Sequence, residues 1–334
     1  MLRYVAISMG EASGTCVEII IKAVQSKPFG AFGGIIVTGD LSVFKKVSKD
    51  MSIPLPFTSY VCCEEDLQRA EEDGEQYIFY NTSVIDMDKF EYGKISADTG
   101  KASYDSLRIA VNLILNRLAF TLVTTSISPE ALTLAGYKEH GLTELLSLFA
   151  SSSRLSNMLV SGKANIFLLS HKRSVKRAVE HVNRENIIDA LVQMDGLFVS
   201  DYFDSSLPIA VGALNPYLGD GKWCGEEEDN AIIPAIKTAN MIKLNVVGPI
   251  RVERLYNEAL EGKYSAVLAM QRNEAYAALA GKDMVVITWG LPFMRVGSTS
   301  AVSLDDAGKN RADISNMKKA LEIAVKISDK GVIA

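Results

Sequence analysis

The sequence predicts an α/β protein of two domains whose sheets are mostly parallel. Three observations support this fold class. The chain has 334 residues, which is enough for about two domains that each bury a core. Short β-branched runs alternate with amphipathic stretches along much of the chain, as in parallel sheets covered by helices. No low-complexity linker separates the parts, so we expect the two domains to share a broad ligand-binding cleft.

The alternation can be followed in order. The first strand is expected in VAIS (5–8), and the amphipathic stretch CVEIIIKAV follows it. Four further strand and helix pairs repeat this order: 33–39 with 41–47, 120–126 with 129–136, 207–214 with 230–239, and 264–270 with 272–281. Residues 54–90 are richer in charge and less periodic, so irregular structure or an antiparallel excursion is expected there.

Composition and charge indicate an ordinary water-soluble globular protein. Apolar residues make up 48% of the chain, charged residues 22%, and the net charge is −5. A nucleic-acid partner is not expected, because it would normally show as a basic stripe. No apolar run is long enough to span a bilayer, and the short run before Glu11 is typical of a first strand and not of a signal peptide.

The four cysteines are scattered without CxxC spacing, and the adjacent Cys62 and Cys63 are poorly placed to pair with each other. The cysteine pattern therefore favours a reduced, cytoplasmic setting.

The segment LNPYLGDGKWCGEEE (214–228) is dense in turn-forming and acidic residues. Its glycines have the spacing G-x-G-x-x-x-G, whereas a dinucleotide loop that opens a helix needs G-x-G-x-x-G, so a Rossmann phosphate loop is disfavoured. The favoured interpretation is structural. Asn215 and Pro216 open a turn, the glycines allow positive φ, and Glu226 to Glu228 place negative charge at the start of the helix NAIIPAI.

Blocks of sequence along the chain resemble the 4-hydroxythreonine-4-phosphate dehydrogenase family. The segment LNPYLGDGKWCGEEEDNAIIPAI is similar to the family's LNPHAGEGG, followed by G-x-EE and an I-x-PAI helix. The opening SMGEASGTCVEIIIKAV resembles MGDPAGIGPEI. Further blocks follow in family order: GKISADTGKASYDSL, TLVTTSISPEAL, GLTELL, VVGPIRVERLY, VLAMQRNEA and TWGLPFMRVGSTSAVSLDDAGKNRADIS. The resemblance covers nearly the whole chain.

This resemblance implies the isopropylmalate-dehydrogenase-like fold, with a cleft between two α/β domains. The first domain would comprise residues 1–133 and 293–334. The second, residues 134–292, would carry the interface of a homodimer, including the apolar segment SNMLVSGKANIFLL. Family enzymes oxidise the secondary alcohol of a phosphorylated hydroxy-amino acid with NAD or NADP, and the β-keto acid then loses carbon dioxide. A divalent metal held by three histidines polarises the reacting oxygen.

The metal ligands of the family are largely replaced in this sequence. His171 stands at the first histidine position, but the second is Tyr217 and the third is Arg272. A guanidinium stays positively charged and cannot coordinate a cation, so no divalent metal is expected. Of the two other histidines, His181 is expected on an exposed helix, and His140 is one position away from the histidine of the family's G-H-T-E block.

Other substrate and cofactor positions are partly kept. The family's polar groups are replaced at four positions: Pro129, Leu142, Ala280 and Val286. The candidate substrate-binding residues are Thr143, His171, Tyr217, Arg272 and Arg295. The candidate cofactor-binding residues, in and after the altered D-H-G-T-A box, are Ser300, Asp305 and Gly308. No catalytic residue is assigned, and the sequence leaves open whether NAD or NADP binds.

Two functions from different classes follow. In the first, the chain has lost the metal-dependent NAD(P) reaction and binds a small anionic ligand or a partner. In the second, it is a metal-independent oxidoreductase or decarboxylase that acts on a different small anionic substrate in a rebuilt cleft. Ordinary 4-hydroxythreonine-4-phosphate dehydrogenation is least favoured, because the groups that carry out the chemistry are mostly replaced while the fold-determining residues are kept.

Arg272 has two interpretations. In the first, its guanidinium takes over part of the missing ion's electrostatic role, and in the family's dimer it would approach Tyr217 and His171 of the other subunit. In the second, it forms a salt bridge with a nearby acid such as Glu274 or Asp220.

Overall fold

The computed structural model describes residues 3–27, 33–152, 155–170, 173–197, 204 and 206–330. It forms two compact units: unit 1 comprises Met1–Leu155 and Thr288–Ala334, and unit 2 comprises Ser156–Ile287. These units divide the chain after residues 155 and 287, whereas the domains expected from the sequence divide it after residues 133 and 292. The domain bounds stay a prediction. No helix among the described residues is long and apolar enough to cross a membrane.

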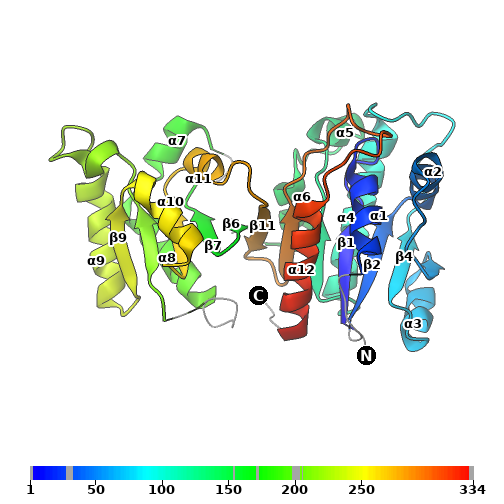
Figure 1. Cartoon of the computed structure of the whole chain (residues 1–334), viewed down its shortest axis with the longest axis horizontal. Coiled ribbons are helices and arrows are strands. Elements are labelled where there is room, and N and C mark those ends of the chain that lie inside the picture. The colour runs from blue at the N-terminus through cyan, green and yellow to red at the C-terminus, as the bar shows by residue number, and fades with distance from the viewer. Residues whose placement is uncertain are drawn as a thin grey trace. The chain divides into compact units, whose positions relative to one another are not determined.

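Unit 1 is a parallel sheet with helices packed on it (Figure 1). Its strands follow the order β3-β4-β2-β1-β5-β12, and each printed pairing among them is parallel. Its elements are β1 (Arg3–Ser8), α1 (Cys16–Gln25), β2 (Gly33–Gly39), α2 (Leu41–Met51), β3 (Ser59–Val61), α3 (Glu64–Glu72), β4 (Tyr77–Asn81), α4 (Ala97–Leu115), β5 (Thr121–Thr124), α5 (Pro129–Leu134), α6 (Leu142–Phe149), β12 (Met294–Ser298) and α12 (Ser315–Lys330).

The core of unit 1 lies on both faces of this sheet. Every residue of β2, β5 and β12 is buried, as expected for parallel strands covered on both sides. Helix α4 packs on β1 and β2, where Leu107 and Ala110 contribute to one buried cluster with Tyr4 and Ile36. Helix α12 packs against β1, β5 and β12 (Figure 1).

The strands of unit 2 have mixed directions and follow the order β6-β7-β10-β8-β9. Strands β6 and β7 form an antiparallel pair, and β7, β10, β8 and β9 run parallel. Strand β11 (Val285–Trp289) crosses the border of the units. The elements of unit 2 are β6 (Ser156–Ser161), β7 (Ala164–Leu168), α7 (Val175–Glu180), α8 (Arg184–Leu197), β8 (Ile209–Gly212), η1 (Pro216–Gly219), η2 (Glu228–Ile232), α9 (Ile233–Met241), β9 (Val246–Ile250), α10 (Val252–Glu261), β10 (Ala266–Ala269) and α11 (Arg272–Ala278).

The segment 54–90 differs from the expectation. It contains a parallel β–α–β unit, since β3 and β4 pair in parallel with α3 between them, whereas residues 54–58 and the chain after Asn81 are irregular, as expected. The excursion is therefore not antiparallel. The many charged residues of α3 mask its helical periodicity in the sequence. The helix has only two buried residues, Leu67 and Ala70, and its acidic residues are Glu64, Glu65, Asp66, Glu71 and Glu72.

Candidate functional site

The carboxyl ends of adjacent strands in unit 2 bring two of the expected metal positions, Tyr217 and Arg272, to one edge of its sheet. Strand β10 pairs in parallel with β7 on one side and with β8 on the other. Arg272 follows β10, Tyr217 follows β8, and residue 171 follows β7. Loops at this edge of a parallel sheet commonly hold ligands. His171 itself lies outside the described residues.

The loop after β8 presents Tyr217 to solvent. Tyr217 lies in the short 3-10 turn η1, its side chain is 70% exposed, and both it and Leu218 adopt positive φ, at 55° and 62°. The glycines at 219, 221 and 225 also have positive φ, which confirms the expected role of those residues. Gly225 has a further reason to lack a side chain, because a Cβ there would lie 2.3 Å from the Asn215 amide.

Two glutamates fasten this loop. Glu228 is 1% exposed, and its Oε1 accepts the backbone N–H groups of Leu214 at 2.8 Å and Asn215 at 2.7 Å. The side-chain amide of Asn215 donates to Glu228 at 2.8 Å and to Glu227 at 2.7 Å. This amide holds the pKa of Glu227 below its usual range. The glutamates therefore hold the loop itself. Only Glu228 and Asp229 lie in the first turn of η2. Of the three glutamates expected to place negative charge at the helix start, only Glu228 therefore does so.

Arg272 begins α11 and is exposed. Its guanidinium lies over the ring of Tyr276, with its carbon 3.9 Å from the ring centroid. Among the described residues it forms no ion pair, so the expected salt bridge with Glu274 or Asp220 is absent. The stacked guanidinium keeps its N–H donors available to another group.

Glu274 on α11 and Tyr256 on α10 are two further polar groups of unit 2. The sequence suggests Glu274 only as a salt-bridge partner of Arg272, and it does not indicate Tyr256. Burial raises the pKa of Glu274 to about 7. Tyr256 on α10 is 4% exposed, and within the described chain its hydroxyl has no hydrogen-bond partner. Burial first, and then the charge of Glu274, raise the pKa of this tyrosine. Their exposure depends on how α10 and α11 pack, so no local motif indicates them.

The residues at the expected metal positions do not fit a divalent ion. Tyr217 offers a solvent-exposed neutral phenol, and Arg272 offers a fixed positive charge. Across the described ranges, which omit His171, there is no group of three or more His, Cys, Asp or Glu side chains that could hold a metal. His140 is exposed, and His181 is the half-buried C-cap of α7, where Asn186 lies 2.8 Å from its Nδ1. Burial lowers the pKa of His181.

The carboxyl edge of the sheet in unit 1 holds the candidate cofactor residues. The loops after β1, β5 and β12 bind one another there: the Glu11 N–H donates to the Ser126 carbonyl at 3.0 Å, and Ser126 Oγ donates to the Ser300 carbonyl at 2.7 Å. The Ser300 hydroxyl accepts from Ser298 Oγ at 2.9 Å. Further along, Asp305 is exposed, and Gly308 packs against the ring of Tyr92.

Glu11 is fully buried at this edge. Its Oε1 accepts hydrogen bonds from the N–H and hydroxyl of Ser13, at 3.1 and 2.8 Å, whereas Oε2 has no hydrogen-bond partner in the described chain. Burial raises the pKa of this carboxyl, against the opposing effect of the Ser13 hydrogen bonds. The sequence indicated only that an acid stands at this position.

Arg295, a candidate substrate-binding residue, is enclosed within unit 1. It is 7% exposed, and its guanidinium donates to the hydroxyls of Thr124, at 3.0 Å from Nε, and Thr288, at 3.1 Å from Nη1. Gly297 makes room for it, because a Cβ there would lie 2.2 Å from Nη2. Thr143 is half-buried in the first turn of α6.

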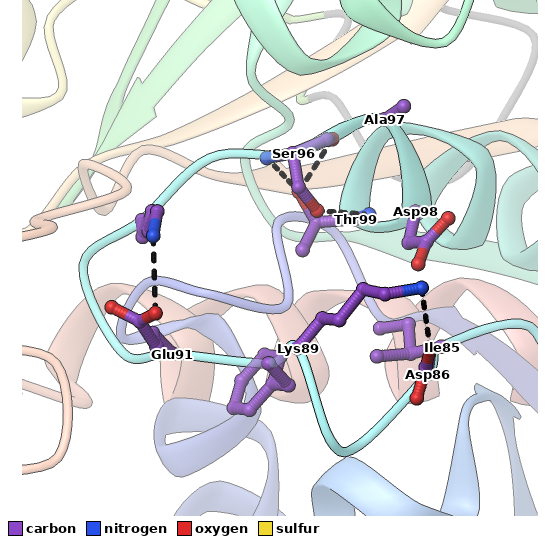
Figure 2. Close-up of a pocket in the computed structure, with 10 residues that line it drawn as sticks. Ile85, Asp86, Lys89, Glu91, Ser96, Ala97, Asp98 and Thr99 are labelled. Carbon is purple, nitrogen blue, oxygen red and sulfur yellow. Dashed lines mark hydrogen bonds and ion pairs between the residues drawn. The ribbon is translucent and has the colours of Figure 1, made fainter.

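A small cavity of about 260 Å³ lies in unit 1 beside the start of α4. Figure 2 shows the Lys89 ammonium reaching between Asp86 and Asp98. Lys89 pairs with Asp86 at 2.8 Å, and Ser96 and Thr99 cap the helix reciprocally. The Lys89 ammonium and the Thr99 N–H are thus already paired, so we assign no ligand to this cavity.

The fold and the two loop edges define a two-unit α/β protein whose loops gather at the carboxyl ends of parallel strands. The family model described as "Pyridoxal phosphate biosynthetic protein PdxA" matches residues 32–324. The chain belongs to this family.

Individual relatives span the chain almost completely. A Fusobacterium nucleatum protein named "Putative D-threonate 4-phosphate dehydrogenase" is 27% identical over 329 residues, covering 98% of this chain and 97% of the relative. Among solved structures, the "putative 4-hydroxythreonine-4-phosphate dehydrogenase" of Salmonella typhimurium is 25% identical, with a TM-score of 0.82 and coverage of 97% of this chain and 99% of that one. The 4-hydroxythreonine-4-phosphate dehydrogenase of Klebsiella pneumoniae is 24% identical, with a TM-score of 0.83 and 98% coverage of both chains. These likenesses confirm the predicted α/β fold class with mostly parallel sheets.

Proposed function

We propose that this protein binds a small anionic ligand through Arg272 and has lost the metal-dependent NAD(P) dehydrogenase and decarboxylase reaction of its family. The observation that carries this proposal is the environment of Arg272. It follows β10 at the carboxyl edge of the unit 2 sheet, is exposed, and forms no ion pair with a described acid. An arginine in this state has a charge and a planar set of donors available for a carboxylate or phosphate.

The chemistry of an arginine limits what such a site does. A bound metal ion lowers the pKa of a coordinated alcohol and polarises a carbonyl directly. A guanidinium donates hydrogen bonds to an anion and stabilises negative charge, but it does not coordinate an alkoxide. The site therefore favours binding, or chemistry that needs only anion stabilisation.

The relatives suggest the ligand class. Their names specify a hydroxy acid or hydroxy-amino acid that carries a 4-phosphate, namely D-threonate 4-phosphate and 4-hydroxythreonine 4-phosphate. We propose that the ligand of this chain is likewise a small phosphorylated hydroxy acid. Such a molecule offers both a phosphate and a carboxylate to a guanidinium.

We also propose that the protein is a homodimer. The strands expected at the interface, β6 and β7, are mostly buried in the core of unit 2 itself, so they add little support. Stronger support comes from large apolar side chains that unit 2 exposes, including Trp223 at 91% and Met241 at 83%. Light scattering at micromolar concentration should give the mass of two chains; a monodisperse monomer would contradict the dimer.

Calorimetric titration tests the ligand and the loss of metal together. Wild-type protein is titrated with D-threonate 4-phosphate, with and without NAD or NADP, and with and without zinc or magnesium. We expect binding that added metal does not strengthen, and no tightly held metal in elemental analysis. One zinc, magnesium, manganese or cobalt ion per chain, or metal-dependent cofactor reduction, would refute the proposed loss.

The double variant Tyr217→His with Arg272→His tests the anchor. It restores the family's residue type at both positions while removing the guanidinium. Weaker binding of the phosphorylated acid in metal-free buffer is expected. Unchanged binding would show that Arg272 is not the anchor. Metal-independent reduction of NAD or NADP by the wild-type protein would instead indicate an active enzyme on this substrate.

A further inference from the structure

We propose that Tyr276 is a positioning residue that holds the Arg272 guanidinium in a fixed orientation for the anion, an inference that rests on the function proposed above. The two side chains lie four positions apart on α11, so they share one face of the helix. The guanidinium carbon lies 3.9 Å from the centroid of the Tyr276 ring, well within the range of a cation–π contact.

The Tyr276 ring is itself held in place by packing against the core of unit 2. Tyr276 is half-buried and packs against the core cluster of unit 2 that contains Tyr256 and Leu279. One part of the ring therefore meets the core while the guanidinium covers it from the solvent side. A stacked guanidinium loses less rotamer freedom when it binds an anion, and its N–H edge stays directed away from the ring.

No acid competes for this orientation among the described residues. Glu274 lies two positions after Arg272 on the same short helix, where side chains do not face each other, and no ion pair joins them. The stack with Tyr276 is thus the interaction that orients Arg272 within the described part of the chain. Aromatic replacement should preserve the function of this position, and aliphatic replacement should not.

The affinity experiment uses inorganic phosphate as the probe. Calorimetry measures its binding to the full-length protein. Tyr276→Leu should weaken phosphate binding by about two- to five-fold, the size expected for an exposed cation–π contact. Tyr276→Phe keeps the ring and should bind as the wild type does. Phe120→Leu removes the ring under Arg3, a separate cation–π pair in unit 1, and should leave phosphate binding unchanged.

A spectroscopic readout separates positioning from general damage to the fold. In wild-type protein the Nε–H signal of Arg272, identified by its loss in Arg272→Lys, should carry a ring-current shift from Tyr276. The shift should persist in Tyr276→Phe and vanish in Tyr276→Leu, while the unfolding temperatures confirm that both variants fold.

The outcomes distinguish the two proposals. If wild-type protein does not bind phosphate, or if Arg272→Gln binds it equally well, the anion-binding function fails, whatever the arginine signal shows. If Arg272→Gln loses binding but Tyr276→Leu binds like the wild type, the function stands and the positioning role is overturned. Equal loss in Tyr276→Phe and Tyr276→Leu would also overturn it, because the hydroxyl and not the ring would then matter.

Discussion

Asn215 and Glu228 are joined twice: the backbone N–H of Asn215 donates to Glu228 Oε1 at 2.7 Å, and its side-chain amide donates to Oε2 at 2.8 Å. Glu228 also accepts the N–H of Leu214. One buried carboxylate therefore fixes the start of the loop that carries Tyr217. Glu228, the last residue of the acidic run, therefore stabilises this loop from a buried position.

Replacing Glu228 with alanine should destabilise the protein. The change leaves three N–H donors of Leu214 and Asn215 without this acceptor, in a site from which water is largely excluded, and should lower the free energy of unfolding by about 2–4 kcal/mol. Urea unfolding measures it. Glu226→Ala, at an exposed position of the same run, is the matched control and should change stability by no more than about 0.5 kcal/mol. Equal effects of the two changes would contradict the assigned role.

Glu11 should make stability depend on pH. Because burial raises its pKa in the folded protein, the folded state holds this proton over a range in which the unfolded state has released it. The contribution of the Glu11 carboxyl to stability is fully present below its pKa in the unfolded state, and it is lost as pH rises toward its pKa in the folded state. Glu11→Gln should therefore gain stability relative to the wild type as pH rises above the ordinary pKa of a glutamate.

Denaturant unfolding at several pH values checks this prediction. Ser13→Ala provides a second variant, because it removes a hydroxyl whose hydrogen bond lowers the pKa of Glu11. In Ser13→Ala the pKa of Glu11 in the folded protein should rise further, so the loss of stability should extend to higher pH. Parallel stability curves for wild-type protein and Glu11→Gln would show that Glu11 does not titrate differently in the folded state.

Gly297→Ala should test the enclosure of Arg295. A methyl group at this position would lie 2.2 Å from the guanidinium, which Thr124 and Thr288 hold in place. Overpacking of this kind should cost about 1–3 kcal/mol. In Gly196→Ala, by contrast, the new methyl lies on helix α8 and meets nothing within 4 Å, so that variant should be neutral or slightly stabilised. A neutral Gly297→Ala would mean that Arg295 moves easily.

The cysteines should separate by reactivity toward a disulfide reagent. All four are free, and Cys16 alone is buried. Burial raises the pKa of the Cys16 thiol to about 11, so little thiolate is present at neutral pH. Three thiols per chain should react in native protein and the fourth only after unfolding. Cys16→Ala should abolish the slow phase; four thiols reacting at one fast rate would contradict the structure.

Much of the fold could be predicted because its signal is local. The runs VAIS, GGIIVTG and FTLVTTS contain or overlap β1, β2 and β5, since short apolar runs between amphipathic stretches are what a parallel sheet buried on both faces requires. The segment that contains α3 was misjudged because its two buried residues are outnumbered by acids. The domain boundary remained a prediction, because boundaries depend on which distant segments pack together.

The sequence by itself determined the residue types at the candidate site: a tyrosine and an arginine at two of the family's histidine positions, and family blocks along almost the entire chain. Residue types and local patterns can be read directly from the order of residues in the chain. Only the tertiary structure decided that Arg295 is enclosed against Thr124, that Glu228 fastens its own loop, and that Arg272 stacks on Tyr276 instead of pairing with Glu274. Burial and hydrogen-bond partners depend on segments that meet only after folding. Two arginines can therefore differ in role, one exposed as a candidate anion anchor and the other enclosed in the interior.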